Sequence, residues 1–135
     1  MAVMRSSTLP LRSLEDLVQI RHAVRALAVE QGLGIVDQTK IVTAASELAR
    51  NTLDYGKGGT ATIEALDENN RRGVRLTFED QGPGIIDIEQ ALRDGFTTGG
   101  GLGLGLGGAK RLSNEFLINS QPGAGTKITI TRWRG

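Results

Sequence analysis

The chain has no cysteine, one histidine and few aromatic residues among its 135 positions. Without cysteine it forms neither a disulfide framework nor a thiolate metal site. The single His22 excludes a histidine-rich metal site, and we expect it on the surface of a helix because it lies in an amphipathic segment. Aromatic residues make up only 4% of the chain, so we expect no stacking platform for single-stranded nucleic acid.

Charge and hydropathy exclude further classes of protein. Sixteen basic and fifteen acidic residues give a net charge of +1, which creates no strong field toward nucleic acid or a membrane. No apolar run reaches transmembrane length, and the N-terminus lacks the apolar core of a signal peptide. We therefore expect one cytoplasmic domain spanning residues 1–135, with no nucleic-acid or membrane partner.

Glycine, in contrast, is concentrated in one segment. Residues 95–108 contain eight of the nineteen glycines, a density that argues against a helix or strand interior. Leucines at 102, 104 and 106 argue against a solvated linker, and the segment runs into what looks like a helix start at Ala109. A glycine loop that leads into a helix presents backbone N–H groups to anions, so the pattern predicts a phosphate-binding loop.

The spacing of apolar residues predicts an α/β (α+β) fold. Apolar positions of helical period favour a helix over 14–31 and a second one from Asp37, as its N-cap, to Tyr55. The remaining pattern predicts strands over 60–66 and 73–80 joined by a turn over 69–73, helices over 87–94 and 106–113, and strands over 115–120 and 125–133. This order indicates a two-layer sandwich, a mixed and mostly antiparallel sheet covered on one face by helices.

One group of polar residues lies on the second helix. Glu47 and Asn51 are four residues apart and share a face, with Arg50 and Asp54 beside them. A solvated helix surface explains this clustering. Magnesium–phosphate chemistry explains it too, because an amide oxygen is a hard neutral ligand and a carboxylate can deprotonate an attacking hydroxyl.

A second group lies where strands end. Asp80 continues the inward face of its strand, so its carboxylate needs a donor, which is either a backbone N–H of the turn or an N–H of a ligand such as adenine. Gly82 and Gly84 would let a flat base approach the backbone. Thr126 faces the same interior, and its hydroxyl is either satisfied by its own backbone or completes a base pocket with Asp80.

In order along the chain, Glu47-x-x-x-Asn51, Asp80-x-Gly82-x-Gly84, the glycine segment and Gly125-Thr126 resemble the Bergerat ATP-binding fold. Gyrase, the Hsp90 chaperones, histidine kinases and the MutL repair proteins share this fold. The resemblance implies that Asn51 holds Mg²⁺, that Asp80 binds the adenine amine and that a glycine lid wraps the triphosphate of ATP. The cofactor-binding residues implied in this way are Asn51, Asp80, Gly82, Gly84, Gly100, Gly101, Gly103, Gly105 and Thr126.

The segments 46–51, 79–85 and 100–103 narrow the resemblance to the RsbT-type switch kinases of bacterial stressosomes, a similarity that runs from about residue 8 to the end. It implies a protein serine/threonine kinase with Glu47 as general base. Its implied partners are STAS-domain scaffold proteins, which it phosphorylates, and a PP2C-type phosphatase, which it activates after changing partner. Arg50 departs from the related sporulation anti-sigma kinases, which carry a second amide there, so no magnesium role is carried over to it.

The sequence also has to be compared with three other functions: an anti-sigma factor, a histidine-kinase domain and a dinucleotide-binding enzyme. An anti-sigma factor that sequesters a sigma subunit is the main alternative, although we expect such proteins to be longer. A detached histidine-kinase domain would need a dimerisation helix pair bearing a phosphoacceptor histidine. A dinucleotide loop at Gly101-x-Gly103 fails because no strand directly precedes it and no acidic residue follows at the required distance. The motifs of eukaryotic-type kinases are absent.

Overall fold

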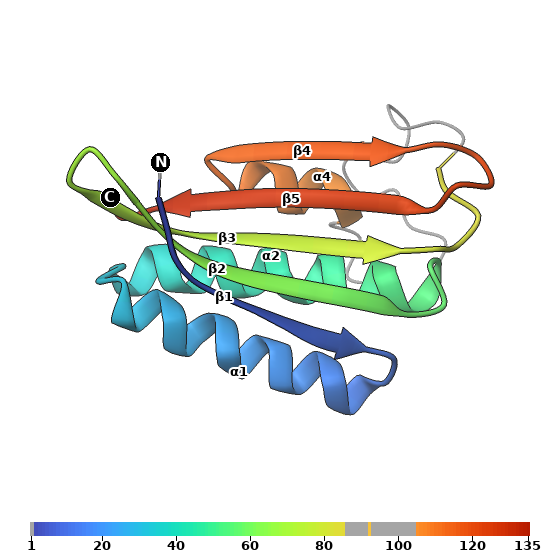
Figure 1. Cartoon of the computed structure of the whole chain (residues 1–135), viewed down its shortest axis with the longest axis horizontal. Coiled ribbons are helices and arrows are strands. Elements are labelled where there is room, and N and C mark those ends of the chain that lie inside the picture. The colour runs from blue at the N-terminus through green and yellow to red at the C-terminus, as the bar shows by residue number, and fades with distance from the viewer. Residues whose placement is uncertain (1, 86–91, 93–104) are drawn as a thin grey trace.

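The computed structural model of the chain describes residues 2–85, 92 and 105–135 (Figure 1). Its elements, in chain order, are β1 (Ala2–Leu11), α1 (Leu14–Glu30), α2 (Ile35–Asp54), β2 (Gly59–Glu68), β3 (Arg71–Asp80), α4 (Gly105–Arg111), β4 (Glu115–Ser120) and β5 (Thr126–Trp133). None of the helices within these ranges combines the length and the apolar composition needed to cross a membrane.

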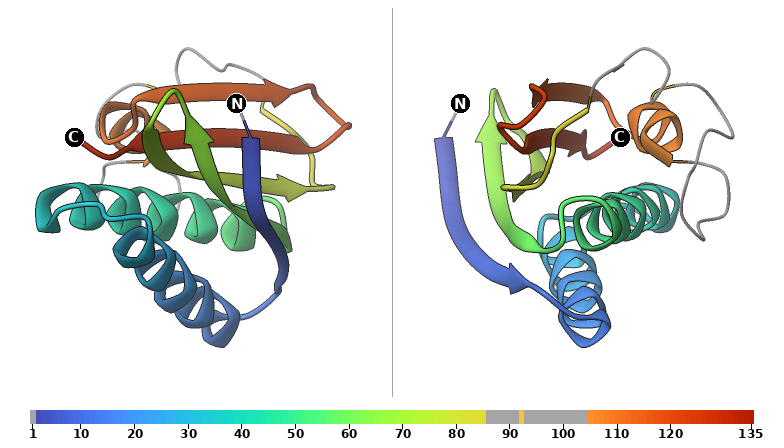
Figure 2. Two further views of the ribbon diagram at one scale, coloured as in Figure 1. Left: turned by 60° about the vertical axis from the view of Figure 1, so that its left-hand side comes forward. Right: turned by 90° about the vertical axis from the view of Figure 1, so that its right-hand side faces the viewer.

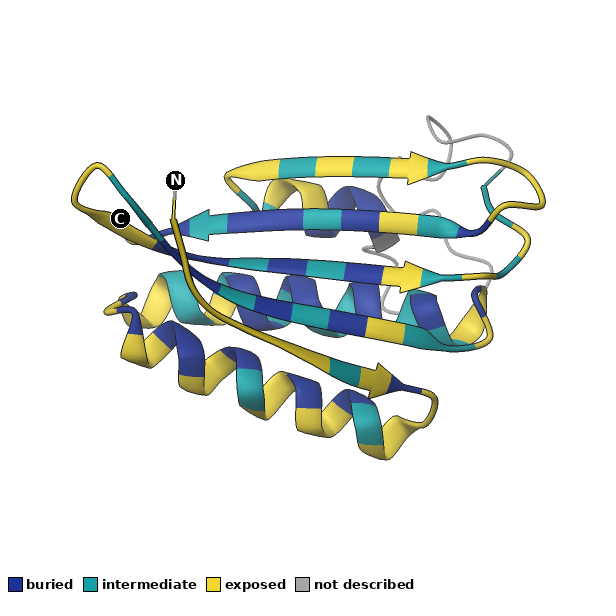
Figure 3. Ribbon diagram, viewed as in Figure 1, coloured by how far each residue is buried: buried dark blue, intermediate teal, exposed yellow. Residues whose placement is uncertain are grey.

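The strands form one sheet in the order β1-β2-β3-β5-β4, and each of the described pairings is antiparallel. Figure 2 shows that the helices cover one face of this sheet. Side chains therefore alternate along the central strands, as the burial colours of Figure 3 show. Val74, Leu76 and Phe78 are buried against the helices, whereas Arg75 and Thr77 on the opposite face are half-buried. The predicted two-layer sandwich is confirmed.

Polar groups at both ends of α1 fix that helix. At its start, the Ser13 hydroxyl accepts a hydrogen bond from the Asp16 N–H and caps the first turn. After its end, the buried Gln31 amide donates to the carbonyl oxygens of Leu66 and Gly73, at 2.9 and 3.0 Å. These two residues face each other across β2 and β3 close to the turn that joins the strands, so Gln31 ties the end of α1 to this hairpin. His22 is exposed on α1, as expected.

Strand β1 is absent from the sequence-based prediction. It is an edge strand that pairs with β2 through the backbone, and its side chains from residue 2 to residue 8 are all exposed. Over that length it buries no face, so it has no apolar alternation for a pattern to detect. Its side chains contact the rest of the fold through the ion pair of Arg5 with Glu30 and, at the end of the strand, through Leu11, which is buried in the core.

Two predicted boundaries were wrong for local reasons. Helix α2 begins at Ile35 with Gly34 as N-cap, because the Asp37 carboxylate binds the C-terminal segment instead: Arg132 donates to it at 2.7 Å and the Gly135 N–H at 3.1 Å. The hydrogen bond from Arg132 holds the pKa of Asp37 below its ordinary value. The turn between β2 and β3 is only two residues long, since Asn69 and Asn70 both adopt positive φ. The helix expected over 87–94 lies almost entirely outside the described residues.

Candidate functional site

Three polar side chains form a row where β3, β5 and β4 meet at one end of the sheet. The register places Asp80 opposite Thr126, and Thr126 opposite Ser120. All three share the face that the helices cover, because each continues the inward alternation of its strand. Directly opposed residues on neighbouring strands have Cβ atoms about 5 Å apart. The row is therefore a compact polar patch beside the apolar core.

Asp80 lies against the end of α2. Its Oδ1 accepts a hydrogen bond from the Gly82 N–H at 2.9 Å, so the turn supplies one of the two donors considered from the sequence. Its Oδ2 lies where a side chain at Gly56 would begin, since a Cβ built there would be 2.5 Å from that oxygen. Gly56 is thus a site residue that the sequence analysis did not identify. The second donor, a ligand N–H, stays a prediction.

Gly82 and Gly84 have a packing role in addition to the expected one. A Cβ at Gly82 would lie 2.8 Å from the Cα of Gly56, and one at Gly84 would lie 2.7 Å from the carbonyl carbon of Gln121. Gly84 also has a φ of +79°, which disfavours other residues. The segment after Asp80 is therefore held between the end of α2 and the β4–β5 turn. That a base approaches these glycines stays a prediction.

The Thr126 hydroxyl is bound by a side chain and not by its own backbone. Its partner is the Ser120 hydroxyl at 2.8 Å. Ser120 also receives the Ile85 N–H at 2.8 Å and contacts the Gly125 carbonyl oxygen at 3.1 Å. The sequence analysis missed Ser120. Its alternation with Phe116 and Ile118 indicates that it faces the interior, but its position beside Thr126 follows only from the register of β4 and β5.

Helix α2 carries the other candidate residues. Glu47 and Asn51 are both half-buried on its flank, between the buried stripe and the exposed face, as is Arg50. Asp54 and Lys57 are exposed near the helix end. In the described part of the chain, no group of three or more histidine, cysteine, aspartate or glutamate side chains is arranged to hold a metal. Asn51 is therefore a candidate single ligand and not a member of a carboxylate cluster.

The glycine segment lies only partly within the described residues. Gly100, Gly101 and Gly103 lie outside them. The helix predicted over 106–113 is confirmed as α4, which begins at Gly105 and packs beside α2. The density of glycine therefore does not exclude a helix in the last four residues of the segment, contrary to the general expectation for 95–108. Gly107 and Gly108 are buried there.

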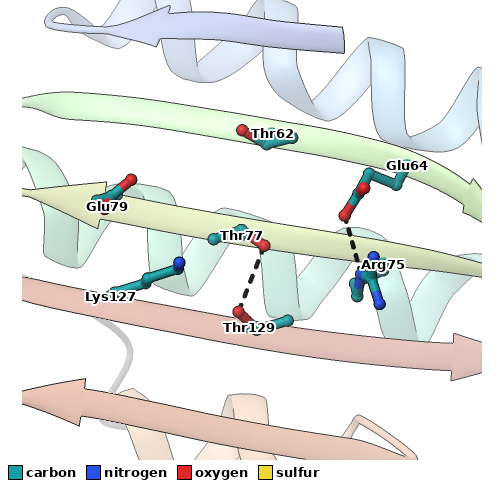
Figure 4. Close-up of a pocket in the computed structure, with 7 residues that line it drawn as sticks. All are labelled: Thr62, Glu64, Arg75, Thr77, Glu79, Lys127 and Thr129. Atoms are coloured by element: carbon teal, nitrogen blue, oxygen red, sulfur yellow. Dashed lines mark hydrogen bonds and ion pairs between the residues drawn. The ribbon is translucent and has the colours of Figure 1, made fainter. Parts of the chain in front are cut away.

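A separate hollow of about 400 Å³ lies on the sheet face that the helices leave open (Figure 4). Its lining is polar and comes from β2, β3 and β5: Thr62, Glu64, Arg75, Thr77, Glu79, Lys127 and Thr129. Alternation along the strands puts these residues on the side opposite to Asp80 and Thr126. This hollow is therefore not part of the row at the sheet end.

Comparison with known proteins agrees with this arrangement. The model of the family described as histidine kinase-, DNA gyrase B- and HSP90-like ATPase matches residues 36–134. The chain belongs to this family. The matched range contains α2, the row at the sheet end and the glycine segment, so the resemblance to the Bergerat fold is confirmed.

Two relatives of known name indicate which members of the family this chain resembles. The chain is 48% identical over 118 residues to the serine/threonine-protein kinase RsbT of Bacillus subtilis, which covers 87% of this chain and 89% of that protein. It is 32% identical over 121 residues to an anti-sigma F factor of Thermoanaerobacter, covering 85% and 83% of the two chains. These relatives confirm the expected place of the chain among the serine/threonine kinases and anti-sigma factors of the family.

The fold recurs in solved structures of low sequence identity. The RsbU and RsbW domains of a Mycobacterium tuberculosis protein align with a TM-score of 0.65 at 23% identity, over 98% of this chain and 34% of that one. The catalytic domain of the histidine kinase ThkA aligns with a TM-score of 0.53 at 16% identity, over 97% of both chains. At these identities the similarity concerns the fold.

The contact between Gly56 and Asp80 predicts a steric effect on stability. We expect Gly56→Ala to lower the free energy of unfolding by about 1–3 kcal/mol, because the added methyl group overlaps the carboxylate. Gly34→Ala is the matched control, since nothing lies within 4 Å of a Cβ there, and its effect should stay within about 1 kcal/mol. Urea unfolding followed by circular dichroism measures both. Equal midpoints for the two variants would contradict the close approach.

Proposed function

We propose that this chain is an ATP- and Mg²⁺-dependent protein serine/threonine kinase whose nucleotide site is the end of the sheet beside α2. The observation that carries the proposal is the register of Asp80 and Thr126, which brings a carboxylate and a hydroxyl together next to the helix that bears Glu47 and Asn51. Membership of the ATPase family and the identity to a serine/threonine-protein kinase support it.

The row suits the edge of an adenine base. Asp80 uses Oδ1 to accept from the Gly82 N–H, and a carboxylate has further acceptor capacity for an exocyclic amine. The space where side chains would stand at Gly82 and Gly84 is filled by Gly56 and Gln121, so we place a flat ring against the other side of this backbone. Thr126 contributes a hydroxyl at the position opposite Asp80. We assign Asp80, Gly82, Gly84 and Thr126 to the base.

Asn51 fits a magnesium ligand in a site of this kind. Mg²⁺ prefers oxygen ligands and usually keeps several waters while it bridges phosphates, so one amide oxygen from the protein is sufficient. When bound, ATP would supply the phosphoryl group and Mg²⁺ would offset the charge of the phosphates. We place the phosphates near Asn51 and assign their remaining contacts to backbone N–H groups of the glycines at 100, 101, 103 and 105, because a glycine-rich segment that precedes a helix suits an anion.

Glu47 has the position of a general base. It lies one helical turn before Asn51 on the same flank of α2, about 6 Å away in an ideal helix. The acceptor serine or threonine would lose its hydroxyl proton to the Glu47 carboxylate as its oxygen bonds to the γ-phosphorus of ATP, while the bond from that phosphorus to the bridging oxygen breaks and ADP leaves. Helix α2 thus holds the group that positions the phosphates and the group that accepts the proton.

The same relatives support a proposal about the partner proteins of this chain. We propose that the chain phosphorylates STAS-domain proteins of a stressosome in the cytoplasm and, after release, activates a PP2C-type phosphatase. The names of its relatives, RsbT and a protein with RsbU and RsbW domains, support a role in partner switching. The half-buried Arg50 and the exposed Asp54 and Lys57 lie on and just beyond the C-terminal part of α2 and are candidates for contact with these partners.

A second candidate function is that of an anti-sigma factor. The similarity to anti-sigma F factors over 85% of this chain favours it. The two functions are not distinguished by the nucleotide site, which both would need. The partner distinguishes them. An anti-sigma factor must bind a sigma subunit, whereas the proposed kinase acts on an STAS-domain protein and needs no sigma subunit.

Asp80→Asn is expected to weaken ATP binding at least roughly tenfold while leaving the fold intact. The asparagine oxygen can keep the bond from Gly82, but its amide group presents a donor where the adenine amine needs an acceptor, which costs about 1–3 kcal/mol. Calorimetric titration with ATP·Mg²⁺ measures the affinity. Asp67→Asn on β2 is the matched control and should bind as the wild type does. Wild-type affinity in Asp80→Asn would remove this residue from the base pocket.

Glu47→Gln is expected to lower phosphotransfer by roughly 10²–10⁴-fold and to leave ATP binding unchanged, because the amide cannot accept the proton. The assay follows transfer of radiolabelled phosphate from ATP to an STAS-domain protein. Glu15→Gln, on the exposed start of α1, provides the control for charge removal. Full turnover by Glu47→Gln would rule out the general-base role.

A further inference from the structure

Ser120 stands behind the proposed base pocket and makes three hydrogen-bond contacts through one hydroxyl. The Ile85 N–H approaches its Oγ at 2.8 Å, the Thr126 hydroxyl lies at 2.8 Å and the Gly125 carbonyl oxygen at 3.1 Å. Ser120 itself is half-buried at the end of β4, one strand farther from Asp80 than Thr126 is. No role follows for it from the nucleotide contacts assigned above.

The chemistry of the three partners fixes the direction of these bonds. A backbone N–H can only donate and a carbonyl oxygen can only accept, while a serine hydroxyl has one proton and two lone pairs. Ser120 therefore donates its proton to the Gly125 carbonyl oxygen. Both lone pairs then accept, one from Ile85 and one from the Thr126 hydroxyl. This is the arrangement that satisfies all three contacts.

In this arrangement the Thr126 proton is directed away from Asp80. Toward Asp80, the Thr126 oxygen therefore presents lone pairs and no proton. The Asp80 carboxylate beside it is also an acceptor. A ligand edge that meets the row must bring N–H donors. The 6-amino group of adenine has two, one for each of the two acceptors. The 6-oxo group of guanine or hypoxanthine is itself an acceptor, so even when the adjacent N1–H donates to one member of the row, the oxygen faces the other.

We propose that Ser120 is a positioning residue that sets Thr126 as an acceptor and thereby makes the site select 6-aminopurine over 6-oxopurine nucleotides. The inference rests on the proposed ATP site and deepens it. It predicts that Ser120 acts on the choice of base rather than on affinity alone. Without the Ser120 oxygen, the Thr126 proton is free to rotate and can meet a 6-oxo group.

The test compares binding of ATP and inosine triphosphate by calorimetric titration with Mg²⁺. The two bases differ at the 6-position of the purine and in the hydrogen that inosine carries on N1. The wild type is expected to prefer ATP, and Ser120→Ala to reduce the ratio of the two affinities by roughly fivefold or more, the value of about one hydrogen bond. Ser120→Thr keeps the hydroxyl and should restore the ratio. Ser113→Ala, which removes a hydroxyl bound to the Ala109 carbonyl, should leave the ratio unchanged.

Each outcome decides between the inference and the function on which it rests. A wild type that does not bind ATP overturns both. A wild type that binds ATP, together with an unchanged ratio in Ser120→Ala, overturns the inference alone, whatever the loss in absolute affinity. If Ser120→Ala does not fold, Thr126→Val replaces it: removing the acceptor that repels the 6-oxo group should also reduce the ratio, and an unchanged ratio there contradicts the inference.

Discussion

The close approach of Gly56 to Asp80 is the constraint on which the arrangement of the candidate site depends. A side chain at Gly56 would overlap the carboxylate, so the end of α2 and the end of β3 are as near as backbone and side chain allow. The chain leaves α2 by a tight turn in which Lys57 and Gly58 adopt positive φ, and Gly59 then pairs with Asp80. The helix that carries the proposed catalytic groups is thereby fixed relative to the sheet.

The same close packing continues around Asp80. Gly82 lies against Gly56, and Gly84 against the β4–β5 turn, where Gly123 donates to the Pro83 carbonyl oxygen at 2.6 Å. Segments far apart in the sequence meet here because the antiparallel register places the end of β3, the start of β5 and the end of β4 side by side. Glycine therefore allows the backbone segments to meet at this end of the sheet, and the N–H groups of Gly82 and Gly123 form hydrogen bonds that hold the segments together.

The sequence predicted what depends on apolar periodicity and missed what does not. Helix α1 and strands β3, β4 and β5 were predicted nearly to their ends because each has one buried face. Strand β1 was not predicted because it pairs through its backbone and most of its length shows no apolar alternation. Asp37 was taken for an N-cap because its partner, Arg132, is distant in the sequence. Asp80 and Thr126 were expected to face the interior, and they do. Ser120 became visible only when the register set it beside Thr126.

Backbone amide chemical shifts, recorded by ¹⁵N-resolved NMR while ATP·Mg²⁺ is added to the wild-type chain, test the location of the nucleotide site most directly. The account predicts the largest changes at the end of the sheet, with Gly82, Ile85 and Thr126 among them, because their N–H groups lie in or beside the row. Changes confined to the open face, at Thr62, Thr77 and Thr129, would place the nucleotide in the hollow of Figure 4 and contradict the account.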